Sequence, residues 1–244
     1  NGIDVSGKIA NANGTVKINS NWGGIDISGD VINNGTTQIF NIPAEGTVVK
    51  FKEGEEIFSY TIDTDSELNI SGNIDTIGTT TITNTGSKGM TISGTVNNTG
   101  DLNIQNGFIP TGENQVTANE SIEALTISGA INNEGNANIS NYAAGGLDVT
   151  EAGNIATSGN LDILNEGIGG LDIFGEVSNN NSADDIYGDT TITNNAGILK
   201  VNGLVDTNDA ELTMTNNGEN FEINGNINGT NNNVNLINNN GGID

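Results

Sequence analysis

The chain of 244 residues contains 35 glycines, 2 prolines and no cysteine, so a disulfide framework and thiolate metal sites are excluded. Its 31 acidic residues against 6 basic ones, all lysines, give a formal net charge of −25. Binding to nucleic acid or to an anionic membrane is not expected, because phosphate groups are neutralised by Lys and Arg, and no apolar run is long enough for membrane insertion.

The first predicted strand begins at an apolar residue, Ile3. The sequence unit that begins there is repeated along the whole chain. Successive opening residues stand 22, 43, 22, 35, 22, 24, 28, 22 and 22 positions apart, so the longer steps are a 22-residue coil plus an insertion. A fixed period of this kind is the signature of a stacked repeat protein. The opening residues are Ile3, Ile25, Leu68, Met90, Leu125, Leu147, Leu171, Leu199, Phe221 and Ile243.

Each unit starts with a predicted short strand. A β-branched residue stands two positions after the opening residue, and such period-two alternation predicts a strand with alternate side chains pointing inward. Each of these inward residues is expected to stack on its counterpart in the next coil. The column consists of Val5, Ile27, Ile70, Ile92, Ile127, Val149, Ile173, Val201 and Ile223.

A glycine follows four positions after the opening residue, and only Glu151 departs from this rule. Glycine adopts positive φ without a Cβ clash, so the pattern predicts a corner of that conformation followed by a second strand. The glycines are Gly7, Gly29, Gly72, Gly94, Gly129, Gly175, Gly203 and Gly225.

A third strand is predicted from a triplet of the form apolar-x-Asn. Asparagine makes up roughly a fifth of the chain, far above ordinary usage. It tolerates corner conformations, and stacked Asn side chains are expected to hydrogen-bond from coil to coil in ladders. The triplets end at Asn41, Asn84, Asn106, Asn141, Asn165, Asn194, Asn216 and Asn238.

These patterns predict an all-β fold, a right-handed single-stranded parallel β-helix with about 22 residues and three short strands per coil. Residues 1–244 are expected to form one continuous solenoid, and since both ends lie inside a unit, a segment of a longer rod. Nine coils spaced by about 4.8 Å would make a rod of roughly 43 Å.

Two insertions, 42–66 and 107–123, interrupt the repeat directly after an Asn triplet. They hold both prolines, Pro43 and Pro110, which stacked strands accept poorly. Strand-like runs on both sides of Glu53 and Gly54 predict that the first insertion is a protruding hairpin. A degenerate coil is the alternative, because 43 is close to twice 22.

No catalytic residue and no cofactor is assigned. Parallel β-helices include polysaccharide-degrading enzymes, but their sites combine clustered Asp with Lys, Arg or His, and this chain has no Arg or His and only scattered lysines. Asp184, Asp185 and Asp189 are candidates for a loosely held cation, although a solvated acidic loop is the preferred interpretation.

Two further features have competing interpretations. Trp22, the single tryptophan, is expected to cover the local core, as aromatic residues commonly do, with an anchor for a sugar or a neighbouring filament as the alternative. The threonine runs 79–81 and 190–191 are expected on an outward strand face because of their β-propensity, with an ice-binding face as the alternative.

The strings GLDIFGEVSNNN, GMTISGTVNNTGDLNIQN and ITNNAG resemble the repeats of very large filamentous-haemagglutinin-like adhesins, especially the leukotoxin-type filamentous adhesins of anaerobic Gram-negative bacteria. The resemblance covers nearly all of the chain apart from the two insertions. It implies a secreted right-handed β-helix, exported by a type V route and displayed at the bacterial cell surface. The cell-killing activity that the leukotoxin name implies has no matching motif here.

The expected function is therefore that of a structural and adhesive rod without enzymatic activity. Its expected partners are neighbouring solenoid segments of the same protein and host-surface or matrix glycans or proteins, met by loops on the rigid scaffold. A purely structural extracellular filament is the first alternative, and a polysaccharide-degrading β-helix enzyme is the second.

Overall fold

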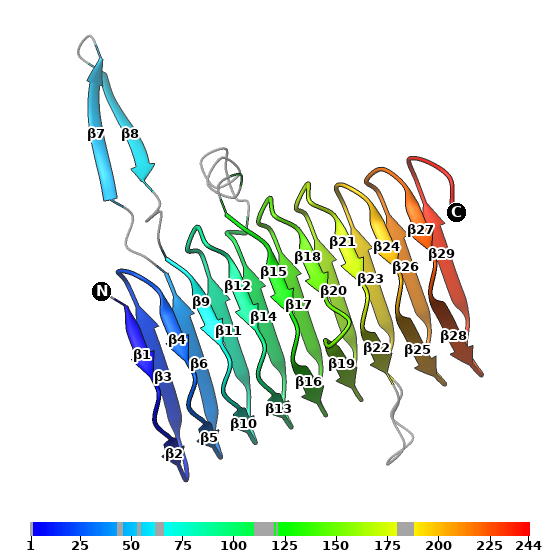
Figure 1. Ribbon diagram of the computed structural model, residues 1–244, viewed down its shortest axis with the longest axis horizontal. Coiled ribbons are helices and arrows are strands. Elements are labelled where there is room, and N and C mark those ends of the chain that lie inside the picture. Colours follow the sequence, from blue (N-terminus) through cyan, green and yellow to red (C-terminus); the bar gives the residue numbers. More distant parts are fainter. Residues whose placement is uncertain are drawn as a thin grey trace.

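The computed structural model describes residues 2–42, 46–52, 55–61, 66–109, 120, 122–179 and 188–244. All regular elements of these residues are β-strands, arranged as three nine-stranded parallel sheets wound into a right-handed solenoid. Each coil contributes one strand to each sheet, and the two termini lie at opposite ends of the stack (Figure 1). The predicted fold class is confirmed.

The first sheet contains the strands that open each coil. They are three residues long, with the first and third side chains inward and the middle one outward. In spatial order they are β1 (Ile3–Val5), β4 (Ile25–Ile27), β9 (Leu68–Ile70), β12 (Met90–Ile92), β15 (Leu125–Ile127), β18 (Leu147–Val149), β21 (Leu171–Ile173), β24 (Leu199–Val201) and β27 (Phe221–Ile223).

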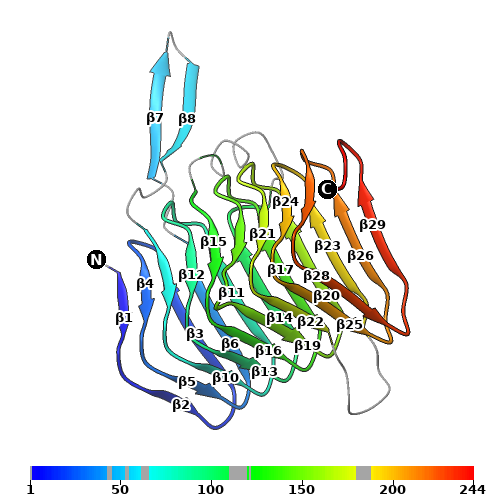
Figure 2. The same ribbon diagram turned by 45° about the vertical axis from the view of Figure 1, so that its right-hand side comes forward.

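The second sheet follows the glycine corner and forms another side of the solenoid (Figure 2). In spatial order its strands are β2 (Ile9–Asn11), β5 (Val31–Asn33), β10 (Ile74–Thr76), β13 (Val96–Asn98), β16 (Ala130–Asn133), β19 (Asn154–Thr157), β22 (Glu176–Asn179), β25 (Leu204–Asn208) and β28 (Asn226–Thr230).

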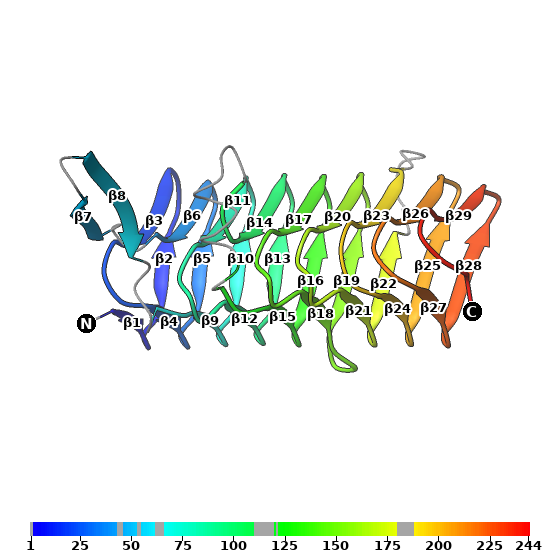
Figure 3. The same cartoon turned by 90° about the horizontal axis from the view of Figure 1, so that it is seen from above.

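The third sheet, whose strands have five or six residues, runs beside the other two along the axis (Figure 3). Its strands are β3 (Thr15–Ser20), β6 (Thr36–Asn41), β11 (Thr80–Asn84), β14 (Leu102–Asn106), β17 (Ala137–Asn141), β20 (Leu161–Asn165), β23 (Thr190–Asn194), β26 (Leu212–Asn216) and β29 (Val234–Asn238).

One apolar core fills the space between the three sheets. Parallel pairing places Ile70 between Ile27 and Ile92, and all three side chains are fully buried. The same register continues through Ile127 and Ile173 to Ile223, which is only partly buried. Full burial of one such side chain contributes about 2 kcal/mol, so the predicted column is a main source of stability.

A separate two-stranded antiparallel sheet, β7 (Gly46–Lys52) and β8 (Glu55–Thr61), belongs to the first insertion. It lies outside the three sheets and projects beyond the stack (Figure 1). The hairpin prediction is confirmed and the degenerate coil is wrong. In the second insertion, residues 110–119 and 121 lie outside the described residues, as do residues 180–187.

Candidate functional site

The predicted asparagine ladder runs through the solenoid at the end of the third-sheet strands. Asn41 Nδ2 donates to Asn84 Oδ1 at 2.7 Å, Asn84 Nδ2 to Asn106 Oδ1 at 2.8 Å, and Asn106 Nδ2 to Asn141 Oδ1 at 2.9 Å. The same bond continues from Asn141 to Asn238. The ladder prediction is confirmed.

These amides also hold the corner that leads back to the first sheet. Asn84 Nδ2 donates to the carbonyl oxygens of Gly86 and Gly89, and Asn141 Nδ2 donates to that of Ala143. Each of these carbonyl oxygens also accepts a backbone N–H, from Gly89, Leu68 and Gly146 respectively, so the amides add a second hydrogen bond at a buried corner. The ladder is therefore structural chemistry and not a ligand site.

The glycine corner is confirmed in position, but the predicted reason for glycine there is wrong. The positive φ values of the described glycines occur elsewhere, mostly just before a first-sheet strand, as at Gly89 and Gly146. At Gly94 a Cβ atom would instead lie 2.0 Å from the carbonyl oxygen of Gly72 in the neighbouring coil. Glycine is required because consecutive corners touch through their backbones. The same clash would occur at Gly29, Gly72, Gly129, Gly203 and Gly225.

The exception at Glu151 is explained by a two-residue extension of one corner. Gly153 takes the place of the missing glycine, and a Cβ at Gly175 would lie 2.0 Å from its carbonyl oxygen. The step of 24 residues between Leu147 and Leu171 has the same origin.

A second polar column lies inside the corner between the second and third sheets, and the sequence analysis missed it. Asn98 Nδ2 donates to Asn133 Oδ1 at 2.7 Å, and the Thr37 and Thr76 hydroxyls are 2.8 Å apart. Its sequence signal was an apolar-x-Asn or apolar-x-Thr triplet in the second strand. The column comprises Asn11, Asn33, Thr76, Asn98, Asn133, Thr157, Asn179 and Thr207.

The cation candidates are not brought together in the described structure. Asp184 and Asp185 lie outside the described residues, whereas Asp189 is exposed and its carboxylate accepts the Glu211 backbone N–H at 3.1 Å. Among the described residues, no group of three or more acidic side chains is placed to hold a metal ion.

Two expectations about exposed side chains are corrected. Trp22 does not cover the core, because 65% of its surface is exposed at the corner between β3 and β4. Of the threonine runs, Thr80 and Thr190 are buried and point inward, since they occupy the inward phase of β11 and β23, while Thr81 and Thr191 point outward.

The outward side chains of the first sheet form an acidic column. Asp148, Asp172, Lys200 and Glu222 are consecutive partners in its register. Partial burial raises the pKa of Asp148, and the neighbouring Asp172 carboxylate raises it further. Burial also raises the pKa of Asp172, with Lys200 opposing and Glu222 reinforcing the shift. Carboxylates one coil apart therefore repel each other at neutral pH.

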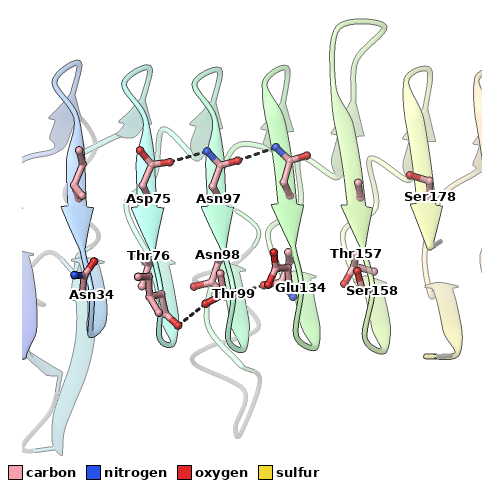
Figure 4. Close-up of a pocket in the computed structure, with 15 residues that line it drawn as sticks. Asn34, Asp75, Thr76, Asn97, Asn98, Thr99, Glu134, Thr157, Ser158 and Ser178 are labelled. Carbon is pink, nitrogen blue, oxygen red and sulfur yellow. Dashed lines mark hydrogen bonds between the residues drawn. The ribbon is translucent and has the colours of Figure 1, made fainter. Parts of the chain in front are cut away.

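A hollow of about 490 Å³ lies on the outward face of the second sheet and its corner with the third (Figure 4). Asn97 Nδ2 donates to Asp75 Oδ1 at 2.6 Å, and Asn132 Nδ2 donates to Asn97 Oδ1 at 2.8 Å, so its floor is a chain of amide hydrogen bonds that crosses the coils. Glu134 and the exposed Ile77 line the corner side.

A second hollow, of about 480 Å³, lies on the outward face of the third sheet. It spans β14, β17, β20 and β23, and its walls are amides, hydroxyls, Asp162 and three apolar or aromatic side chains, Ile109, Tyr142 and Leu164. Both hollows are partly open to solvent and combine polar groups with apolar surface, which suits contact with an extended partner better than enclosure of a small molecule.

No family model, no curated protein and no solved structure matches the chain. The family resemblance of the repeats therefore stays a prediction. In the described part of the chain, no helix has the length and apolar character that crossing a bilayer demands.

Proposed function

We propose that the chain is a structural and adhesive rod of a secreted bacterial surface protein. The observation that supports the proposal is the unbroken in-register pairing of three nine-stranded sheets, with the β7–β8 hairpin standing outside them. Coils that contact only their neighbours make a stiff elongated scaffold, and segments that protrude from such a scaffold commonly carry recognition. In this proposal the protein acts outside the cell, beside other solenoid segments of the same protein.

The hairpin is the proposed contact with a host-surface or matrix component. The solenoid on both sides of it is closed independently of the hairpin, because Asn41 Nδ2 donates to Ser66 Oγ at 2.9 Å and the Ser66 carbonyl oxygen accepts the Lys88 N–H. The first bond joins the two ends of the insertion, and the second pairs Ser66 with the coil that contains Lys88. A short Gly-Ser linker can therefore replace residues 43–65 without opening a coil.

The test compares this deletion with the parent chain for binding to coated collagen, fibronectin and laminin and to cultured cell layers. The matched control replaces residues 180–187, whose flanks are likewise joined by a hydrogen bond from Asn179 Nδ2 to the Gly188 carbonyl oxygen. Loss of binding only in the 43–65 deletion, with unchanged far-UV circular dichroism, is the expected result. Equal binding by all three chains would refute the hairpin as the contact, and absence of binding by all three would leave a purely structural filament.

The proposal also treats the protein as a non-enzyme. A screen for hydrolase and lyase products on acidic and neutral polysaccharides is expected to give none. Turnover of any of these polymers would show instead that the protein is a polysaccharide-degrading enzyme.

A further inference from the structure

The outward face of the third sheet is formed by two straight columns of side chains, nine in each. Register places each residue beside its counterpart on the next strand. One column is Lys17, Gln38, Thr81, Asn103, Asn138, Asp162, Thr191, Thr213 and Asn235, and the other is Asn19, Phe40, Thr83, Gln105, Ser140, Leu164, Thr193, Thr215 and Ile237.

This face is almost without charge in a chain whose net charge is −25. Its two columns contain one base, Lys17, and one acid, Asp162, and the Lys17 ammonium lies 5.6 Å from the centre of the Phe40 ring. The outward column of the first sheet differs sharply, because five of its nine members are acids. That column is Asp4, Asp26, Asn69, Thr91, Thr126, Asp148, Asp172, Lys200 and Glu222.

The middle of this face is hollowed and carries polar groups, apolar groups and one carboxylate, that of Asp162. Gln105, Ser140 and Thr193 present amide and hydroxyl groups to the hollow of about 480 Å³. Tyr142, Leu164 and the 53% exposed Ile109 supply apolar surface beside them. Aromatic and aliphatic surface next to uncharged donors and acceptors matches the two sides of a sugar ring, which has apolar C–H faces and a hydroxyl rim.

The charge of the protein surface indicates which class of ligand the third sheet can bind. A sulfated or uronate polymer would be repelled by the net charge of the chain, and a cationic partner would favour the acidic first sheet. The neutral face exposes groups that bond hydroxyls, repeated along the axis at about the 4.8 Å spacing of neighbouring strands. We propose that the third sheet binds an uncharged polysaccharide chain that lies across the coils over the central hollow. This site is separate from the hairpin and goes beyond the proposed contact there.

The experiment uses the full chain and affinity electrophoresis in gels that contain dextran, galactomannan or xyloglucan, with dextran sulfate as the charged counterpart of dextran. At least one neutral polymer is expected to retard the protein, while dextran sulfate is not. The double variant Gln105→Glu and Ser140→Glu places two carboxylates side by side in the hollow. Their desolvation is expected to weaken binding at least about tenfold.

The matched control is Thr91→Glu and Thr126→Glu, which adds the same charge at paired outward positions of the first sheet in the same two coils. It is expected to bind like the parent chain. Replacement of 43–65 is also expected to leave this binding unchanged, so failure of the hairpin contact and failure of this site are distinguishable. Absence of retardation by all three neutral polymers, equal weakening by both double variants, or tighter binding to dextran sulfate would overturn the proposal. Concentration-dependent dimerisation that only the Gln105→Glu and Ser140→Glu pair abolishes would overturn it in favour of contact between copies.

Discussion

Asn84 and Asn106 stand one coil apart, and the Asn84 Nδ2 donates a 2.8 Å hydrogen bond to the Asn106 Oδ1 inside the solenoid. Both side chains are fully buried. An amide is suited to this position because it donates to one neighbour while accepting from the other, so the same residue can be repeated in every coil.

Replacement of Asn106 by Ala is expected to destabilise the coils around it. The Asn141 Oδ1 and the Glu123 carbonyl oxygen both lose the Asn106 donor. The Asn141 Oδ1 is buried, and a buried group left unpaired costs about 1–3 kcal/mol. Hydrogen exchange of the third-sheet amides, measured by mass spectrometry, reports the loss coil by coil. The control Asn97→Ala removes an exposed amide from the hydrogen-bond chain on the second sheet, and it is expected to change stability by less than about 0.5 kcal/mol. Equal loss of exchange protection in both variants would contradict a special role for the buried ladder.

Gly94→Ala is expected to lower the free energy of unfolding by about 1–3 kcal/mol or more, because the new methyl group meets the Gly72 carbonyl oxygen. Gly7 occupies the same corner in the first coil, and a Cβ there would have no atom within 4 Å. Gly7→Ala is therefore the matched control and should be close to neutral. Urea denaturation followed by circular dichroism compares the two, and a similar midpoint for both variants would show that backbone contact does not select glycine.

Ile127→Ala is expected to cost about 2–5 kcal/mol, since Ile127 is fully buried between Ile92 and Val149 and its truncation leaves a cavity. The neighbouring Thr126 points outward, so Thr126→Ala should change stability by no more than about 0.5 kcal/mol. Thermal unfolding gives the comparison. A charge at the same site, as in Ile127→Asp, is expected to separate the stack locally, and tolerance of that charge would contradict the inward placement.

Asp148→Asn is expected to stabilise the protein at neutral pH. The folded state raises the pKa of Asp148, so it binds the proton more tightly than the unfolded state does. Stability therefore falls as the pH rises from the ordinary pKa of 3.8 through the folded pKa, and the charged form is unfavourable above both. The uncharged Asn side chain removes the destabilising effect of the charged carboxylate. The gain in melting temperature over the parent should be full at pH 7 and should vanish below pH 3.8; a gain that does not depend on pH would rule out this origin.

The sequence alone was sufficient for the solenoid, because stacking requires like residues at like positions. The column from Ile27 to Ile223 and the ladder from Asn41 to Asn238 occur where the 22-residue period predicts them. The second polar column also had a sequence signal, but this signal was missed because Asn and Thr occur in it without a regular order.

The period of the sequence determined which residues face the core, since a strand alternates its side chains and a coil must return each residue above its predecessor. Only the tertiary structure decided why Gly94 is glycine, that Trp22 is exposed, and that the third sheet presents a face with almost no charge. These properties depend on distances between residues of neighbouring coils and on which outward columns adjoin, and a one-dimensional pattern does not contain either quantity.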